Sequence, residues 1–111
     1  MDKLTYHTLV FEVTKQIPHG RITTYGAIAE YLAFRSPRMV GWALNHCSFF
    51  ESGIPAHRVV NRKGELTGRH HFPTPTMMEE LLRQEGVAVS NDTVVDFDKR
   101  FIHPNEFMGG R

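Results

Sequence analysis

The sequence has few of the residues that crosslink a chain, bind structural zinc or span a membrane. Its 111 residues include one cysteine, Cys47, which excludes an internal disulfide and a zinc site built from several cysteines. Hydrophobic runs are short and interrupted by charge, so none predicts a membrane-spanning helix. The first residues lack the apolar stretch of a signal peptide. We therefore expect a cytoplasmic protein with no membrane partner.

The sequence also lacks repeats, low-complexity tracts and long linkers, so we expect one compact domain. Hydrophobic residues make up 41% of the chain, which is enough for one modest core. The net charge is only +1, but residues 35–71 carry six Lys or Arg against two Asp or Glu, and residues 72–98 carry one against six. The basic middle segment favours an anionic partner, although ordinary solvated surface charge would give the same pattern.

Hydrophobic spacing and capping residues predict a mainly helical first half. Residues 3–15 carry apolar side chains at helical spacing, and Ile17-Pro18-His19-Gly20 ends that helix. Thr24 is suited to cap a second helix, and Ser36-Pro37 to begin a third. The third helix has one apolar stripe, formed by Val40, Ala43, Leu44 and Cys47. Two short helices with a tight connection fit a helix-turn-helix.

The second half predicts a small β-hairpin, a further helix and short strands. Val59-Val60 and Glu65-Leu66 flank a turn that contains a glycine, as in many hairpins. A helix is expected from Thr76, with Glu79 completing a capping box and Gly86 following its end. Residues 87–95 fit one or two short strands. We assign the domain to residues 1–98 and expect residues 99–111 to form a loose C-terminal tail.

The run Ile54-Pro55-Ala56-His57-Arg58-Val59 is the most informative motif. It resembles Pro-Cys-His-Arg-Val, the active-site signature of the O6-alkylguanine-DNA alkyltransferases, with Ala56 at the position of the nucleophilic cysteine. A thiolate attacks an alkyl carbon and a methyl side chain cannot. The resemblance therefore implies a member of the non-catalytic, alkyltransferase-like branch, which is not an enzyme and has no catalytic residue. It covers about residues 5–89 and includes Thr24-Tyr25-Gly26, Val40-Gly41-Trp42-Ala43-Leu44 and Leu81-Leu82-Arg83-Gln84-Glu85-Gly86.

The resemblance implies that Tyr25 and Arg38 flip a nucleotide out of the duplex. Tyr25 matches a tyrosine that helps to rotate the target nucleotide, and Arg38 matches an arginine that fills the gap left in the base stack. A cation in the first turn of a helix opposes the helix dipole, so folding does not favour Arg38 there. Without the resemblance, Tyr25 would be expected in the core, and Arg38 in a phosphate contact or a surface ion pair.

A pocket for the extruded base is implied around Tyr25, Ala56 and Arg69. Alkyltransferase-like proteins commonly have tryptophan where this chain has Ala56, so the smaller side chain leaves room for larger adducts. Arg69 matches a basic residue of the pocket loop that would contact the edge or the face of the guanine. A solvated loop arginine is the alternative. Further DNA contacts are expected at Thr24, Gly26, Pro37 and Trp42, although partial burial is an equally good interpretation of Trp42.

The resemblance implies that His57 and Glu85 form a hydrogen-bonded pair with no thiol left to activate. Glu85 shares the apolar face of its helix with Met78, Leu81 and Leu82, where a carboxylate needs a partner. A surface histidine and a solvent-facing glutamate are the alternative. His70 and His71 indicate metal binding only weakly, because no cysteine or carboxylate cluster accompanies them. We expect no metal and no cofactor.

The sequence thus predicts a monomeric, mainly α-helical domain with a small β-hairpin, a helix-turn-helix and winged-helix-like fold resembling the alkyltransferase C-terminal domain. The resemblance implies that it binds O6-alkylguanine in double-stranded DNA through the minor groove, flips the nucleotide and passes the lesion to nucleotide excision repair proteins. A winged-helix transcription regulator without lesion preference is the alternative. Enzymatic repair through Cys47 is a third hypothesis, although a thiol on an apolar helix stripe is more often inert.

Overall fold

The computed structural model describes residues 3–46 and 53–109, which form a body of 37 × 30 × 22 Å. Two hydrophobic clusters make up its core. The first lies among the N-terminal helices and includes Val10, Ile28 and Val40. The second lies beneath the C-terminal half and includes Ile22, Leu66 and Leu82. Among the described helices, none is long and apolar enough to cross a membrane.

The first half contains the three predicted helices, α1 (Lys3–Lys15), α2 (Tyr25–Tyr31) and α3 (Pro37–Leu44). The Thr24 side chain accepts a hydrogen bond from the Ala27 amide and caps α2, and Ser36 caps α3 by accepting from the Arg38 amide. These local caps confirm both predicted helix starts. α3 packs against both α2 and α1, and the inward faces of the three helices form the first cluster.

The predicted hairpin at residues 59–66 is wrong in its strand pairing. Strand β2 (Val59–Val60) pairs in parallel with β1 (Thr23–Thr24), far earlier in the chain. The turn with Gly64 at φ 83° is present, but Glu65 forms an isolated bridge with Thr93 instead of a ladder with β2. A turn is specified by neighbouring residues, whereas the partner of a buried strand is chosen by the packing of the whole core.

Helix α5 (Met77–Gln84) follows, and Gly86 ends it in the left-handed region at φ 86°, as expected. The predicted capping box is wrong, because the Thr76 hydroxyl donates to the Glu80 carboxylate and makes no capping bond. Strands β3 (Val89–Ser90) and β4 (Thr93–Val94) then form an antiparallel pair. The turn between them places two non-glycine residues at positive φ, Asn91 at 53° and Asp92 at 57°.

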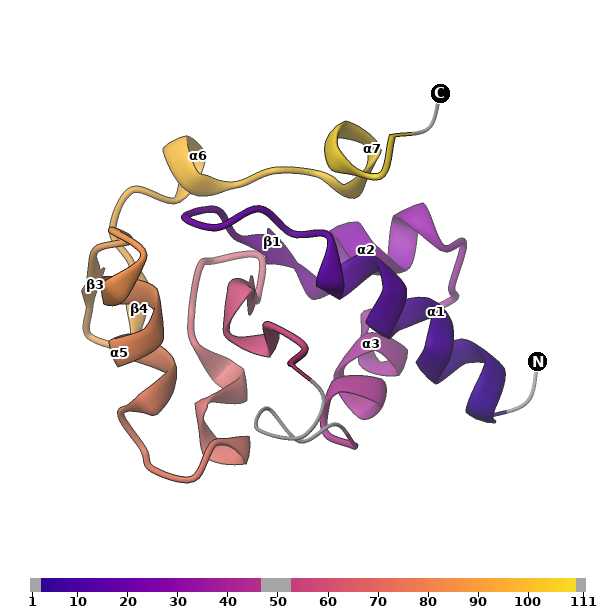
Figure 1. Cartoon of the computed structure of the whole chain (residues 1–111), viewed down its shortest axis with the longest axis horizontal. Helices are drawn as coiled ribbons and strands as arrows, with labels where there is room; N and C mark the ends of the chain where they lie inside the picture. The colour runs from indigo at the N-terminus through magenta and orange to yellow at the C-terminus, as the bar shows by residue number, and fades with distance from the viewer. Residues whose placement is uncertain (1–2, 47–52, 110–111) are drawn as a thin grey trace.

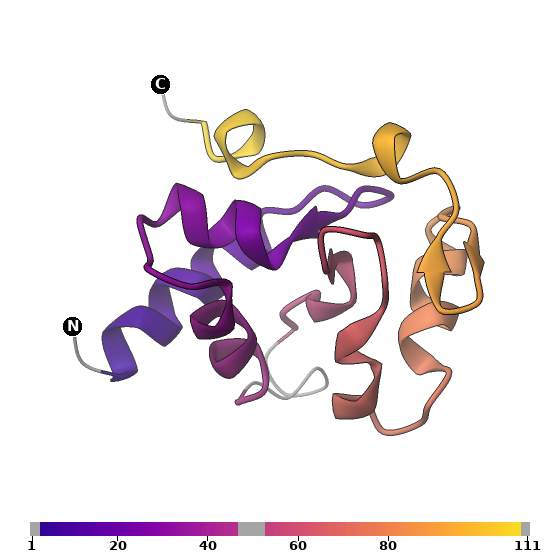
Figure 2. The same cartoon turned by 180° about the vertical axis from the view of Figure 1, so that it is seen from behind.

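The C-terminal segment crosses both halves of the molecule, where the sequence predicted a loose tail. It contains two short helices, α6 (Phe97–Arg100) and α7 (Pro104–Phe107), and both views show it lying over the N-terminal and C-terminal halves (Figures 1 and 2). Ile22 and Phe101 form a parallel bridge, and Ile102 is buried. Four-residue helices carry too little hydrophobic periodicity to be recognised in a sequence, which explains the difference.

Candidate functional site

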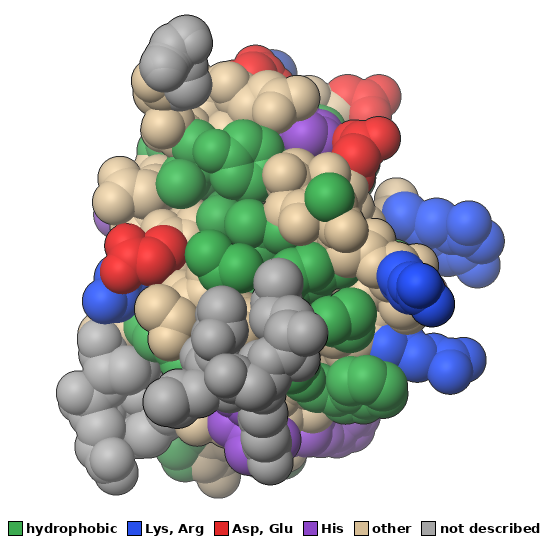
Figure 3. All heavy atoms as spheres, turned by 90° about the vertical axis from the view of Figure 1, so that its right-hand side faces the viewer, with side chains coloured by type: hydrophobic (Ala, Val, Ile, Leu, Met, Phe, Trp, Pro, Cys, Tyr) green, Lys and Arg blue, Asp and Glu red, His purple; other side chains and the backbone are tan. Residues whose placement is uncertain are grey.

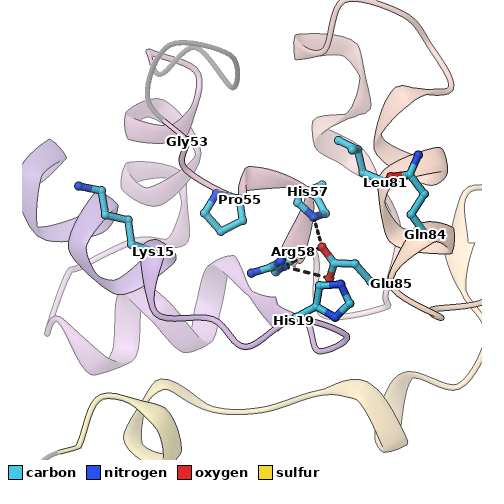
Figure 4. Close-up of a pocket in the computed structure, with 9 residues that line it drawn as sticks. All are labelled: Lys15, His19, Gly53, Pro55, His57, Arg58, Leu81, Gln84 and Glu85. Carbon is cyan, nitrogen blue, oxygen red and sulfur yellow. Dashed lines mark hydrogen bonds and ion pairs between the residues drawn. The ribbon is translucent and has the colours of Figure 1, made fainter.

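A short 3-10 helix, η1 (Ala56–Arg58), lies between Pro55 and strand β2. Ala56 is half-buried and packs against the first hydrophobic cluster, which Tyr25 also contacts. The next two side chains reach the C-terminal end of α5 (Figure 4). His57 is only 4% exposed, so its ring needs polar partners inside the protein.

The Glu85 carboxylate receives hydrogen bonds from two other parts of the chain, η1 and the loop after α1. The His57 ring lies with Nε2 2.6 Å from Glu85 Oε2, which confirms the predicted pair. Arg58 donates from Nε to both oxygens at 3.0 Å and from Nη2 to Oε2 at 2.8 Å. The Gly20 amide donates to Oε1 at 2.9 Å, and Arg58 Nη1 donates to the carbonyl of Ile17. We call His57, Arg58 and Glu85 with the Gly20 amide the Glu85 network.

Burial and hydrogen bonding set the charges in this network. Burial lowers the pKa of His57, although the hydrogen bond and charge of Glu85 oppose that shift. Burial alone would raise the pKa of Glu85, but hydrogen bonds from Arg58, His57 and the Gly20 amide outweigh it and lower the pKa from 4.5 to about 2. A neutral imidazole held by an ionised carboxylate is the arrangement of a general base. The residue beside it, Ala56, offers no proton to remove.

A cavity of about 440 Å³ lies against the Glu85 network (Figure 4). It is lined by Lys15, His19, Gly53, Pro55, His57, Arg58, Leu81, Gln84 and Glu85. The side chain of Arg58 lies across it, between α1 and the end of α5. This cavity contains neither Tyr25 nor Arg38, so it is distinct from the cavity that those two residues share.

Tyr25 and Arg38 line one cavity of about 300 Å³ between α3 and a second 3-10 helix, η2 (Thr67–His71). We call it the α3–η2 cavity, and its lining comprises Tyr25, Pro37, Arg38, Gly41, Asn45, Thr67, Gly68 and His71. Burial raises the pKa of Tyr25, against the effect of a hydrogen bond with the Thr67 side chain. Arg38 is exposed at the start of α3, and no acidic residue lies in the first turn of that helix.

Gly68 permits the close packing of η2 on Tyr25. A Cβ atom at position 68 would lie 2.9 Å from the Tyr25 hydroxyl, too close for any side chain without movement. The backbone of η2 therefore forms a wall directly against the tyrosine hydroxyl.

A third cavity, of about 470 Å³, shares Tyr25 and Pro37 with the α3–η2 cavity. Its other lining residues are Gly26, Asn61, Arg62, Lys63 and Glu65. The Asn61 side chain accepts hydrogen bonds from the amides of Lys63 and Glu65, so the turn carrying the two cations is held in one shape. Tyr25 thus borders two hollows of the same surface.

Other residues expected at the site lie elsewhere or are occupied. Arg69 is not among the lining residues of the α3–η2 cavity: its Nη1 donates to the Leu66 carbonyl at 2.9 Å, and its Nε lies 3.5 Å from the Asp92 carboxylate. The Thr24 hydroxyl is engaged in capping α2. Trp42 is 53% exposed on α3, which leaves it accessible to a partner. Cys47 lies outside the described residues.

Sequence reasoning missed two side chains that the structure brings into these sites. The sequence analysis assigns no role to Arg58, which forms an ion pair with Glu85. A buried glutamate beside a neutral histidine needs a nearby cation, and this requirement could have identified Arg58. His71 was considered only as a metal ligand. In the described part of the chain, no group of three or more His, Cys, Asp or Glu side chains is placed to hold a metal ion.

Several known proteins are similar to this chain. Residues 5–87 match the family described as 6-O-methylguanine DNA methyltransferase, DNA binding domain. The chain is 31% identical over 93 residues to alkyltransferase-like protein 1 of Schizosaccharomyces pombe, a match that covers 83% of this chain and 85% of the relative. It is 37% identical over 93 residues to the DNA base-flipping protein of Escherichia coli, covering 81% and 68%.

Methyltransferases of the family are also similar, over a smaller part of their length. The methylated-DNA–protein-cysteine methyltransferase of Methanosarcina acetivorans is 36% identical over 78 residues, which span 69% of this chain and 48% of that protein. Among solved structures, S. pombe Atl1 in complex with damaged DNA containing O6-carboxymethylguanine superimposes with a TM-score of 0.82 at 27% identity, covering 94% of this chain and 100% of that chain. The small, mostly helical fold predicted from the sequence is thereby confirmed.

Proposed function

The chain belongs to the 6-O-methylguanine DNA methyltransferase family, and from this premise we propose that it binds O6-alkylguanine in duplex DNA without transferring the alkyl group. One observation carries the proposal: in the run Pro55-Ala56-His57-Arg58-Val59, alanine stands where the resembled signature has cysteine, directly before the His57 of the Glu85 network. The likeness to an alkyltransferase-like protein bound to damaged DNA supports it.

The DNA-binding surface in this proposal is the side of the molecule that carries α3 and the turn after β2. Arg35, Arg38, Arg62 and Lys63 are exposed there, and none of them forms an ion pair with another described residue. Figure 3 views the molecule from the right-hand side of Figure 1, and Lys and Arg side chains project from one edge of that face. Unpaired exposed cations are suited to phosphates, so binding should weaken as salt concentration rises.

The α3–η2 cavity would receive the extruded nucleotide. O6 of guanine lies inside the duplex, so a pocket can inspect the modified base only after the nucleotide has rotated out. Tyr25 forms part of the wall of this cavity, and Arg38 lies at its rim on the exposed end of α3. We assign to Tyr25 the rotation of the nucleotide and to Arg38 the space that the nucleotide leaves in the base stack.

No alkyl group would move to the protein. Alkyl transfer needs a nucleophile whose sulfur displaces the O6 oxygen of guanine, and the methyl group of Ala56 has no such atom. A protein that holds a lesion without removing it serves repair by marking the site. We therefore propose that the chain acts as a monomer and hands the lesion to nucleotide excision repair proteins.

The decisive experiment compares affinities for two duplexes that differ only by O6-methylguanine in place of guanine, measured across several salt concentrations. The proposal expects tighter binding to the modified duplex at each concentration. Equal affinities would exclude lesion recognition and favour a winged-helix regulator that reads DNA sequence. In a parallel assay with DNA labelled in the O6-methyl group, the protein should stay unlabelled; label on the protein would indicate transfer through Cys47 and exclude the non-enzymatic role.

A further inference from the structure

Helix η2 places two of its basic residues, Arg69 and His71, in different surroundings. Arg69 lies against Asp92 in the turn between β3 and β4 and against the carbonyl of Leu66. His71, two residues later, lines the α3–η2 cavity together with Tyr25 and Arg38. Of these two basic residues, η2 therefore brings His71 to the cavity, whereas the Arg69 guanidinium lies beside Asp92.

Few polar side chains of the α3–η2 cavity are free to bind a base. The Tyr25 hydroxyl is already hydrogen-bonded to Thr67. Arg38 lies at the exposed start of α3, where its proposed role is in the base stack. Asn45 and His71 remain, and neither side chain has a hydrogen-bond partner among the described residues.

We propose that His71 is a specificity-determining residue that reads the Watson–Crick edge of the extruded base, an inference that rests on the proposed function. Guanine carries a proton on N1, whereas O6-alkylguanine has an unprotonated N1 with a lone pair. An imidazole N–H donates to that lone pair in the modified base. In guanine N1 is itself a donor, so the ring has to present its unprotonated nitrogen instead, which requires it to turn or to change tautomer.

This difference in N1 protonation is what lets His71 discriminate. A ring held with its N–H facing N1 gains a hydrogen bond with the modified base and none with guanine, and the gain is modest because His71 is exposed. A cation that bound the phosphate backbone would strengthen binding to both bases equally. The effect of His71 should therefore be confined to the ratio of the two affinities.

The experiment measures the ratio of affinities for the O6-methylguanine and guanine duplexes in four variants. His71→Ala removes the ring, His71→Phe keeps a ring without N–H groups, and His71→Gln keeps a donor without the ring. His70→Ala is the matched control, since His70 is exposed on the same helix and is not among the lining residues of the cavity. His71 is also exposed, so thermal unfolding should show all four variants folded.

Loss of one hydrogen bond predicts a ratio lowered by roughly three- to tenfold in His71→Ala and His71→Phe. His71→Gln should retain part of the ratio, and His70→Ala all of it. An unchanged ratio in His71→Phe, an equal loss in His70→Ala, or parallel weakening of both duplexes would each overturn the role of His71. Equal binding of both duplexes by the unsubstituted protein would instead reject the proposed function itself.

Discussion

Glu85 connects segments that lie far apart in the sequence. Its carboxylate joins the loop after α1, through the Gly20 amide, to η1, through His57 and Arg58, at the end of α5. The side chain is only 8% exposed, so these bonds are shielded from water. The pair of His57 and Glu85 thus belongs to a junction that fastens three segments of the chain.

The Glu85 network predicts that stability falls in acid over two ranges of pH. His57 has a lowered pKa in the folded state, so the unfolded chain takes up a proton first, and stability declines as pH drops below about 6.5. Glu85 has its pKa lowered from 4.5 to about 2, so its contribution is complete above 4.5 and is lost as pH falls toward 2. Urea unfolding at a series of pH values measures the free energy of unfolding across both ranges.

Glu85→Gln should abolish the lower of these two ranges and, at pH 7, lower the free energy of unfolding by about 3 kcal/mol, because it leaves a buried cation without its counter-charge. Glu80→Gln is the control, since Glu80 is exposed and contacts only the Thr76 hydroxyl. A pH profile of Glu85→Gln that matched the unsubstituted protein would show that the network does not control acid stability.

Arg38 and Arg35 offer a matched test of the nucleotide-flipping role. Both are exposed cations near the start of α3, but only Arg38 is among the lining residues of the α3–η2 cavity. Either substitution by alanine removes one positive charge and should weaken binding to unmodified DNA by a similar factor. Arg38→Ala should in addition lower the preference for O6-methylguanine by several-fold. An equal preference in the two variants would reject the special role of Arg38.

At the scale of elements, the connection between α2 and α3 contains a strained residue. Ala33 has φ 59°, in the left-handed region that a Cβ atom makes unfavourable. Ala33→Gly should therefore raise the free energy of unfolding by about 1 kcal/mol, measured by chemical denaturation. The control is Ala88→Gly at an exposed position outside the positive-φ residues, which should lower it. A destabilised Ala33→Gly would show that the turn gains nothing from glycine.

Elements with local signals were predictable, and elements fixed by distant partners were not. Thr24 and Ser36 marked the helix starts because a capping side chain bonds an amide two or three residues away. β2 was assigned to a hairpin because nothing in Val59-Val60 indicates that its partner is β1. The position of Arg69 was missed for the same reason, since its carboxylate partner, Asp92, lies in a turn of another element.

At the site too, contacts implied by a motif were predictable, and contacts set by the path of the backbone were not. The His57–Glu85 hydrogen bond followed from two motifs and is present. Tyr25 and Arg38 line one cavity, but Ala56 and Arg69, which were expected to complete the lesion pocket with Tyr25, are not among its lining residues. That His71 lines it instead depends on how η2 turns, which no local pattern encodes.

At the scale of the whole molecule, the C-terminal segment ties the two core clusters together. Ile22 donates a backbone hydrogen bond to Arg100 and accepts one from Ile102, while Arg100 donates to the carbonyls of Gly20 and Gly86. The His103 ring lies with Nε2 2.8 Å from Oε1 of Glu30, near the end of α2. This segment is therefore part of the folded unit.

Ile102→Ala should test that attachment. The side chain is buried, and its truncation should lower the free energy of unfolding by about 2–4 kcal/mol, because it removes apolar contact and leaves a cavity. Asn105→Ala, at an exposed position on α7, is the control and should change it by less than about 0.5 kcal/mol. Equal stability of the two variants would show that the segment is dispensable for folding.

The arrangement around Glu85 bears on how a repair enzyme can give up its chemistry. Replacing the cysteine of such a site by alanine discards one sulfur atom and disturbs no bond of the scaffold. Changing His57, Arg58 or Glu85 would instead loosen the junction of three segments. Position 56 takes no part in that junction, so the three segments stay joined whether or not a nucleophile is present there.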